Sequence, residues 1–195
     1  MLKKRIIPTL LIDNEVLVKT TNFKNKKYIG DPSNTVRIFN ELEVDELIVL
    51  DISDDRFNKT PNYKLLQDMS SQSFMPLTYG GGINNIDKAK KIFDLGFEKI
   101  SINTQTFKKP ELLPELARIF GSQAIICSID YKKILFGGNQ VFIKNGIEKT
   151  NLNVKEWALK LEENGAGEIL LTSIDNEGTW NGMDKNTINE IAENI

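Results

Sequence analysis

Short apolar runs alternate with amphipathic segments along most of this chain, and this alternation limits what it can fold into. The apolar runs are rich in β-branched residues and lie at 5–12, 46–52, 74–79, 99–103, 124–130 and 168–173. Each is followed by a segment with helical spacing, at 35–42, 63–70, 86–95, 110–119, 154–164 and 185–193. Strands that are apolar on both faces are typical of a parallel sheet covered by helices, so the sequence predicts an α/β fold.

Two segments interrupt the alternation. Residues 14–30 form a long excursion after the first apolar run, and they carry Lys19, Lys24, Lys26 and Lys27. Residues 135–149 contain Gly137-Gly138 and Asn145-Gly146, which predict a hairpin after the fifth run. Both segments follow the carboxyl end of a predicted strand, where α/β folds bind ligands. For the lysine run, however, a solvated surface loop is the commoner role.

The chain also contains an internal repeat. An offset of 122 residues aligns residues 44–53 with 166–175 and pairs Glu46 with Glu168. An offset of 119 residues aligns residues 6–11 with 125–130 and pairs Leu11 with Asp130. The first predicted strand therefore resembles the fifth, and the second resembles the sixth. Two similar halves of four units would give eight strands, of which this chain supplies six.

Composition narrows the possible chemistry. The 195 residues include no histidine and one cysteine, Cys127. This excludes Ser-His-Asp triads, Cys-His pairs and His-ligated zinc, and we predict neither a metal site nor a cofactor. A net charge of −2 argues against nucleic-acid binding. No membrane span or secretory signal is predicted, and a lone cysteine fits a reducing cytosol, so we expect a cytoplasmic protein.

A glycine triplet, Gly80-Gly81-Gly82, follows the third apolar run and precedes a predicted helix start at residue 86. Glycines at such a place let backbone N–H groups approach an anion, and the start of a helix adds a favourable dipole. Asn103 and Thr104, at the end of the next run, add amide and hydroxyl donors. A phosphate site and a plain turn are equally compatible with this pattern.

Carboxylates end several of the predicted strands. Asp51 and Asp130 close apolar runs, and Asp175 and Glu177 follow the last one. Carboxylates at strand tips serve as general acids or bases, and burial shifts their pKa toward the working pH. A helix cap or a bond that orients a loop is an equally common role for such residues.

Charged residues stand at the opposite ends of the strands. Each of them begins an apolar run, and they are Arg5, Glu46, Lys99 and Glu168. In a closed barrel these four positions would converge at the bottom as alternating charges. A structural ring of salt bridges is the commoner use of such charges.

Taken together, these residues resemble the cyclase subunit family of imidazole glycerol phosphate synthase, a (βα)8 barrel. The resemblance extends over residues 1–195 and is carried by Lys4-Arg5-Ile6-Ile7-Pro8, Ile29-Gly30-Asp31-Pro32, Leu50-Asp51-Ile52, Gly80-Gly81-Gly82-Ile83, Ser101-Ile102-Asn103 and Gly165-Ala166-Gly167-Glu168. It implies a single TIM-barrel domain over 1–195 that is short at its C-terminus, with six of the eight βα units present.

The resemblance also implies a partner, a substrate and site residues. Ammonia made by a glutaminase partner would enter at the bottom of the barrel through a gate of Arg5, Glu46, Lys99 and Glu168, and would react at the top with a phosphorylated substrate. Lys19 would lie in a mobile loop over that substrate. Gly82, Asn103 and Thr104 would match one phosphate site, with Gly81 in the same turn.

One departure concerns the acid and base. The family uses two aspartates, at the tips of the first and fifth strands; Asp130 matches the second, but Leu11 occupies the place of the first. Leucine can neither give nor take a proton. Asp13 lies two residues further on and could substitute if the strand extends that far. Glu177 also stands where the family usually has aspartate, and with Asp51 and Asp175 it is a predicted substrate-binding residue.

Three functions therefore remain open. The pattern around Leu10-Leu11-Ile12 and Lys19-Thr20 favours a divergent branch of the family, associated with supplying ammonia for acetamidino sugars of surface glycans. The alternatives are the cyclase of histidine biosynthesis and an inactive, truncated scaffold. Ammonia-dependent turnover of different substrates separates the three.

Overall fold

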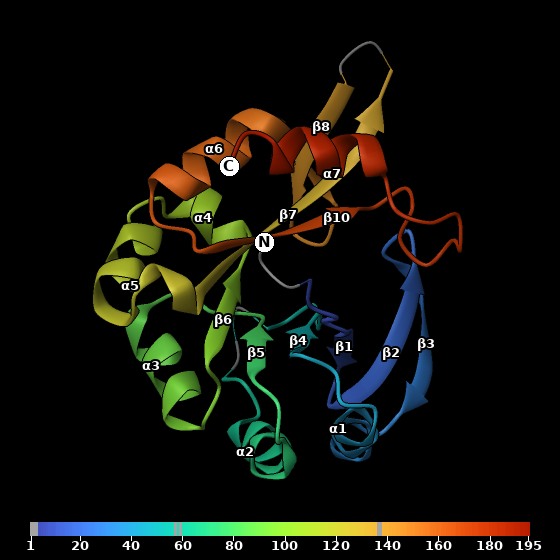
Figure 1. Ribbon diagram of the computed structural model, residues 1–195, viewed down its shortest axis with the longest axis vertical. Coiled ribbons are helices and arrows are strands. Elements are labelled where there is room, and N and C mark those ends of the chain that lie inside the picture. Colours follow the sequence, from blue (N-terminus) through green and yellow to red (C-terminus); the bar gives the residue numbers. More distant parts are fainter. Residues whose placement is uncertain (1–3, 57, 59, 136–137) are drawn as a thin grey trace. The chain divides into compact units, whose positions relative to one another are not determined.

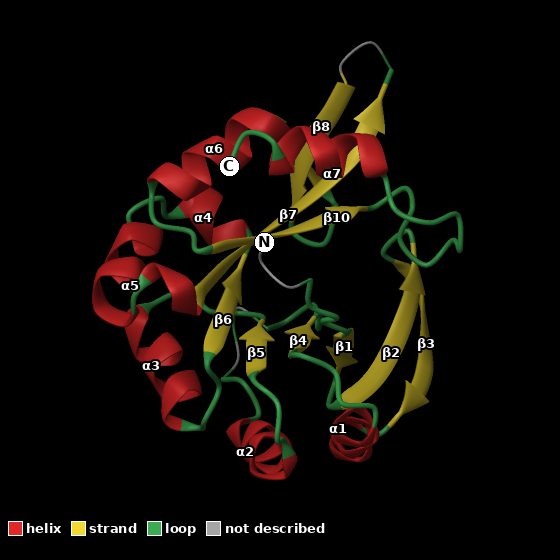
Figure 2. Cartoon of the chain, viewed as in Figure 1, coloured by secondary structure: helices red, strands yellow, loops and turns green. Residues whose placement is uncertain are grey.

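The computed structural model describes residues 4–56, 58, 60–135 and 138–195. These residues form two compact units, one of residues up to 19 together with 27–101 and the other of residues 20–26 with 102–195. In the described part of the chain, four parallel strands lie in the first unit and two in the second, and helices follow them along the sequence (Figures 1 and 2). The predicted α/β class is confirmed.

The first unit holds four parallel strands. β1 (Thr9–Asp13) pairs with β4 (Leu47–Asp51), β4 pairs with β5 (Leu77–Gly80), and β5 pairs with β6 (Lys99–Ile102). Helices α1 (Pro32–Glu41), α2 (Tyr63–Gln72) and α3 (Ile86–Asp94) lie on the outer side of these strands (Figure 1). All of these strands and helices overlap the predicted ranges, because the apolar spacing that indicates them is also what packs them together.

Short polar side chains start these helices. The Asp31 carboxylate accepts a hydrogen bond from Asn34 N at 2.8 Å before α1, and Pro32 occupies the first turn. Asn62 and Asn85 accept equivalent bonds at the starts of α2 and α3. Each such bond satisfies one N–H group that has no partner inside its helix, which fixes where the helix begins.

The predicted strand at 74–79 starts later than expected. Phe74 is 91% exposed, and β5 begins only at Leu77, after Pro76. Proline has no N–H group to give to a sheet, so it limits the strand at this end. Leu77 N instead donates to Glu98 Oε2 at 2.7 Å.

The second unit is built around β7 (Ile125–Ile134) and β10 (Glu168–Ser173), which run parallel. The helices of this unit are α4 (Thr104–Lys108), α5 (Leu112–Phe120), α6 (Val154–Glu163) and α7 (Lys185–Ala192), with a 3₁₀ turn at Ser122–Ala124. The sequence did not indicate α4, because its five residues are too few to show a helical period.

The hairpin predicted at 135–149 is confirmed, and it belongs to a larger antiparallel meander. β8 (Gly138–Ile143) pairs with β7, and β9 (Glu148–Asn153) pairs with β8. Gly137, used in the prediction, lies outside the described residues.

The segment at 14–30 forms a hairpin of two strands, whereas a loop was expected. The expected solvent exposure of its lysines, Lys19, Lys24, Lys26 and Lys27, is confirmed. β2 (Val16–Thr21) runs antiparallel to β1, and β3 (Lys24–Gly30) pairs with β2. The turn residues Asn22 and Phe23 have φ of 52° and 62°, as a tight hairpin turn requires. Phe23 occupies a position where glycine is usual, which is why the sequence did not signal the turn.

The internal repeat appears in the strand pairing. Leu11 pairs with Leu50 in the first unit, and Asp130 pairs with Thr172 in the second. The two repeat offsets relate these pairs residue for residue. Each first strand is also followed by an antiparallel partner, β2 or β8. Leu11 and Asp130 are therefore structural equivalents in the two halves of the repeat.

A partly buried hydrogen-bond network at the start of α7 predicts a dependence of stability on pH. Hydrogen bonds from Thr187 and from Tyr131 Oη hold the pKa of Asp184 below its ordinary value, although burial works in the opposite direction. A lowered pKa contributes stability at pH values above the unfolded-state pKa, and this contribution is lost as the pH falls through the folded-state pKa. We expect Asp184→Asn to lose about 1 kcal/mol near neutral pH. Urea melts should show this difference shrinking below about pH 4, and a constant difference would contradict it.

Candidate functional site

In the first unit, carboxylates gather at the carboxyl ends of β1 and β4. Asp51 Oδ1 accepts a hydrogen bond from Ser53 N at 2.8 Å, and Ser53 Oγ accepts one from Asn14 N at 3.1 Å. Because β1 ends at Asp13, the condition for Asp13 to share a strand face with Leu11 is met. The structure thus places Asp13 and Asp51 on adjacent strand ends, where Ile12 pairs with Asp51.

The glycine turn packs closely against the loop after β4. A Cβ atom on Gly81 would lie 2.6 Å from Cβ of Asp51, and one on Gly82 would lie 2.2 Å from the carbonyl oxygen of Arg56. Lys88 Nζ, from α3, donates to the Gly82 carbonyl oxygen at 3.2 Å, and desolvation lowers the pKa of this lysine. A lysine ammonium group beside a glycine turn can bind an anionic group. No sequence pattern indicated Lys88 as a functional residue.

A small cleft opens beside these strand ends. Its volume is about 90 Å³, and its lining consists of Ile12, Glu15, Asp51, Ser53, Thr60, Asn62, Leu65, Leu66 and Tyr79. Asn62 Nδ2 donates to Glu15 Oε1 at 2.8 Å across part of it. Burial, and then the charge of Asp51, raise the pKa of Tyr79 far above its ordinary value, so this phenol stays protonated.

In the second unit, Asn103 and Asp130 meet at the ends of neighbouring elements. Asn103 Nδ2 donates to Asp130 Oδ2 at 2.7 Å, and Asp130 is 8% exposed. Asn103 stands immediately before α4, but its side chain does not cap that helix. The carboxamide instead orients a buried carboxylate, which is the arrangement that a positioned acid or base needs.

Thr104, next to Asn103, is linked to the β8–β9 turn. Its side chain is buried, and its Oγ1 accepts a hydrogen bond from Lys144 N at 3.1 Å. Thr104 and Asn103 thus hold backbone and carboxylate groups of their own unit in place. Phosphate binding by Asn103, Thr104, Gly81 and Gly82 stays a prediction.

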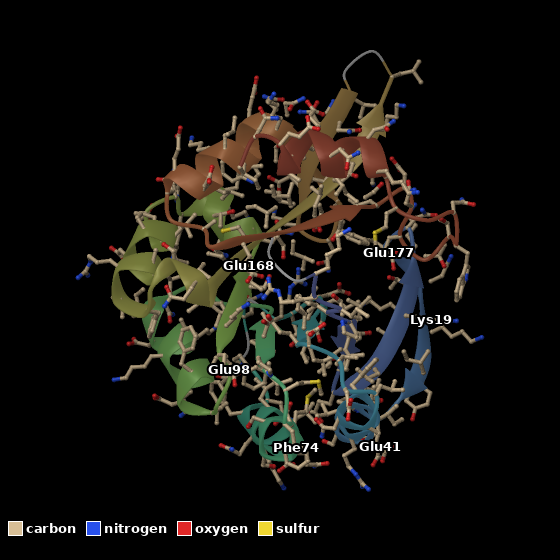
Figure 3. All side chains as sticks on the ribbon, in the orientation of Figure 1. Lys19, Glu41, Phe74, Glu98, Glu168 and Glu177 are labelled. Carbon is tan, nitrogen blue, oxygen red and sulfur yellow. The ribbon has the colours of Figure 1, made fainter. Side chains whose placement is uncertain are left out.

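Asp175 and Glu177 lie in the loop after β10. Asp175 Oδ2 accepts a hydrogen bond from Lys133 N at 2.9 Å. Both carboxylate oxygens of Glu177 accept bonds from the β2–β3 hairpin. Substrate contact by either residue stays a prediction, as does the role of Lys19, which is exposed on β2 (Figure 3).

Three of the four predicted gate residues come together in the first unit. Glu46 bonds to Arg5 through Oε1 and to Lys99 Nζ through Oε2, the latter at 2.8 Å. The side chains of Glu46 and Lys99 are only 9% and 14% exposed. Glu168 belongs to the second unit, at the start of β10 (Figure 3). These ion pairs are compatible both with a structural ring of salt bridges and with a gate for ammonia. The gate function therefore stays a prediction.

Removing the charge of Glu46 should cost stability. In Glu46→Gln the mostly buried Lys99 ammonium loses the charge of its partner at 2.8 Å, and we expect a loss of about 2–3 kcal/mol. Urea unfolding with an unchanged m-value would measure this loss. Glu148→Gln is the matched control, because its 2.7 Å pair with Lys144 is exposed and should leave the midpoint unchanged. Equal midpoints for the two variants would contradict the prediction.

The sequence similarity of this chain to known proteins shows its family. The family described as "Histidine biosynthesis protein" matches residues 5–195. The chain belongs to this family. A Pseudomonas aeruginosa protein named "Putative imidazole glycerol phosphate synthase subunit hisF2" is 48% identical over 195 residues, which cover all of this chain and 78% of the relative. The imidazole glycerol phosphate synthase subunit HisF of Clostridium botulinum is 41% identical over 196 residues, with the same coverage.

The members of this family have the TIM-barrel fold, which is an α/β fold. In this chain the strands of that fold are β1, β4, β5, β6, β7 and β10. Among the described residues, no group of three or more His, Cys, Asp or Glu side chains is arranged to hold a metal ion. No helix in the same residues is both long and apolar enough to cross a membrane. Burial raises the pKa of Cys127 to about 12, so this thiol is an unreactive core residue.

Proposed function

We propose that this chain is the synthase subunit of a glutamine amidotransferase of the imidazole glycerol phosphate synthase type, which adds ammonia to a sugar substrate for surface-glycan synthesis. The proposal of a sugar substrate rests on the difference between Asp130 and Leu11, which occupy equivalent positions in the two halves of the internal repeat. One half of the repeat offers a buried, oriented carboxylate, and the other offers an alkyl side chain at the same position. A cyclisation that needs two carboxylates has lost one of them.

Asp130 would act as the single general acid or base. The hydrogen bond that Asn103 Nδ2 donates to Asp130 Oδ2 fixes the orientation of this carboxylate. The surroundings of Leu11 are apolar, because its strand partners are Val18 and Leu50. An apolar surface of this kind favours binding of the carbon face of a sugar over binding of a second charged group. No cofactor is required by this proposal, and we place the protein in the cytoplasm.

A glutaminase subunit is the proposed partner and ammonia source. The ion cluster of Arg5, Glu46 and Lys99 lies at the amino-terminal ends of β4 and β6, which is the entry side in this proposal. Apolar side chains are exposed at the same ends of the strands, with Phe74 at 91% and Ile6 at 71%. Exposed apolar groups next to charges are typical of a surface that binds another protein.

The second candidate is the cyclase of histidine biosynthesis. It is favoured by the names of relatives that are 41% identical to the chain, including one from Chloroherpeton thalassium. Asp13, at the end of β1, would then have to replace the missing carboxylate. An inactive scaffold is the third possibility.

Turnover with ammonium chloride tests these functions without the partner. The purified chain is incubated with either a keto sugar or a bisphosphate ribosyl substrate, and products are followed by mass spectrometry. Product from the sugar alone supports our proposal, product from the ribosyl compound supports the histidine reaction, and no product with either supports a scaffold. Asp130→Asn should lower any turnover by about 10²-fold or more.

The partner surface predicts the effect of a surface mutation. Phe74→Ala should weaken binding of the glutaminase by about tenfold or more, because a large exposed ring at an interface contributes much of the affinity. Titration calorimetry would measure this effect. Trp180→Ala is the matched control, since Trp180 is 94% exposed but lies in the loop after β10. An equal loss of affinity in both variants would contradict the assigned surface.

A further inference from the structure

The turn of the β2–β3 hairpin is fastened to the loop that follows β10. Thr20 Oγ1 donates to Glu177 Oε1 at 2.7 Å, and Phe23 N donates to Glu177 Oε2 at 2.9 Å. The two oxygens of one carboxylate therefore hold a side chain and a backbone group of the hairpin. Hydrogen bonds to a charged acceptor are shorter and stronger than neutral ones, so this is the strongest link between the two segments.

Backbone groups of the same loop add three further bonds. Asn22 N donates to the Glu177 carbonyl oxygen at 2.9 Å. Asn22 Nδ2 donates to the carbonyl oxygens of Ile174 and Asp175 at 2.9 and 2.8 Å. The turn residue Asn22 is thus bound through both its main chain and its side chain, which holds the turn in one orientation.

Two glycines make room for this contact. A Cβ atom on Gly178 would lie 2.2 Å from the Thr20 carbonyl oxygen. A Cβ atom on Gly146, in the β8–β9 turn, would lie 2.8 Å from the Ile174 side chain and 3.2 Å from the Phe23 ring. The hairpin turn therefore fits closely against two separate loops, and larger residues at either glycine would displace it.

We propose that Glu177 is a positioning residue that clamps the turn of the β2–β3 hairpin and so holds the strand that carries Lys19. Lys19 directly precedes Thr20 on β2 and is exposed (Figure 3). Thr20 is buried, and its hydroxyl group bonds to Glu177. Alternation along the strand puts the two side chains on opposite faces, so holding Thr20 fixes the face of the strand from which Lys19 projects. The evidence for the clamp consists of hydrogen bonds between described residues. Only the role of Lys19 in substrate binding rests on the proposed function.

Hydrogen exchange of the full 195-residue chain tests the clamp without any ligand. In Glu177→Gln the side chain has lost its charge and one acceptor oxygen, so amides in peptides covering residues 20–26 should exchange about tenfold faster. The matched control is Glu162→Gln, an exposed glutamate on α6. Unchanged exchange at 20–26, or equally faster exchange throughout the chain, would overturn the proposal.

A second pair of variants separates the bonds from the packing. Thr20→Val removes only the hydroxyl donor, and combined with Glu177→Gln it should add less than its separate effect, because both changes break the same bond. Full additivity would show that the two side chains do not act together and would count against the clamp.

Kinetics with ammonium chloride and whichever substrate is turned over then test the positioning of Lys19. Glu177→Gln should raise KM by about tenfold and change kcat little, because a free hairpin weakens binding rather than chemistry. An unchanged KM overturns the positioning role. If the wild-type chain turns over neither substrate, the proposed function fails while the exchange result still decides on the clamp.

Discussion

Gly82→Ala is expected to destabilise the protein by about 3 kcal/mol, the largest loss of stability among the changes considered. The new methyl group would lie 2.2 Å from the carbonyl oxygen of Arg56, and a backbone oxygen cannot move aside as a flexible side chain can. The φ of +65° adds strain for any residue with a Cβ atom. Urea unfolding of the purified variant would measure the loss.

Gly138→Ala is the control that isolates the contact from the backbone strain. Gly138 has a φ of +68°, close to that of Gly82, but an added Cβ atom would meet nothing within 4 Å. We expect this variant to lose only about 1 kcal/mol. Similar losses at both positions would show that the close approach to Arg56 is unimportant.

The glycine turn also shows what the sequence could and could not predict. Three consecutive glycines indicated a close backbone approach, either to an anion or within a simple turn. The structure adds a third cause, packing of Gly81 and Gly82 against the loop after β4. A partner that lies far away in the sequence leaves no local pattern, so this cause could not be read from residues 80–82 alone.

The fold itself was largely predictable because its signals are local and repeated. Among the described residues, apolar periodicity predicted the strands β1, β4, β5, β6, β7 and β10 and every α-helix except the short α4. The repeat offsets reappear in the pairing of Leu11 with Leu50 and of Asp130 with Thr172. The β2–β3 hairpin was missed because Asn22 and Phe23 form a turn without glycine. The sequence indicated Glu177 either as a substrate contact or as a carboxylate that orients a loop, and the structure shows the second role. Its partners could not be predicted, because the hydrogen bonds from Thr20 and Phe23 join segments more than 150 residues apart.

Leu11→Asp should create cyclase activity toward a bisphosphate ribosyl substrate, with a rate about 10²-fold above that of the unmodified chain. The repeat makes position 11 the equivalent of Asp130, so the new carboxylate would occupy the matching place at the tip of β1. Its strand neighbours Val18 and Leu50 are apolar, and desolvation by them should raise its pKa toward the range useful for proton transfer. Ammonia-dependent product formation, followed by mass spectrometry, measures the gain.

The same substitution in an Asp13→Asn background tests whether Asp13 already supplies the missing group. If Asp13 acts as the acid or base, Asp13→Asn should abolish ribosyl turnover in the unmodified chain and leave the Leu11→Asp chain active. If the first half of the repeat instead serves as an apolar wall for a sugar, Asp13→Asn should have little effect on sugar turnover, while Leu11→Asp should lower it. A folded Leu11→Asp protein without any ribosyl turnover would show that more than one carboxylate separates this chain from a cyclase, because β1 already extends to Asp13 and positions the residue at 11 within a paired strand.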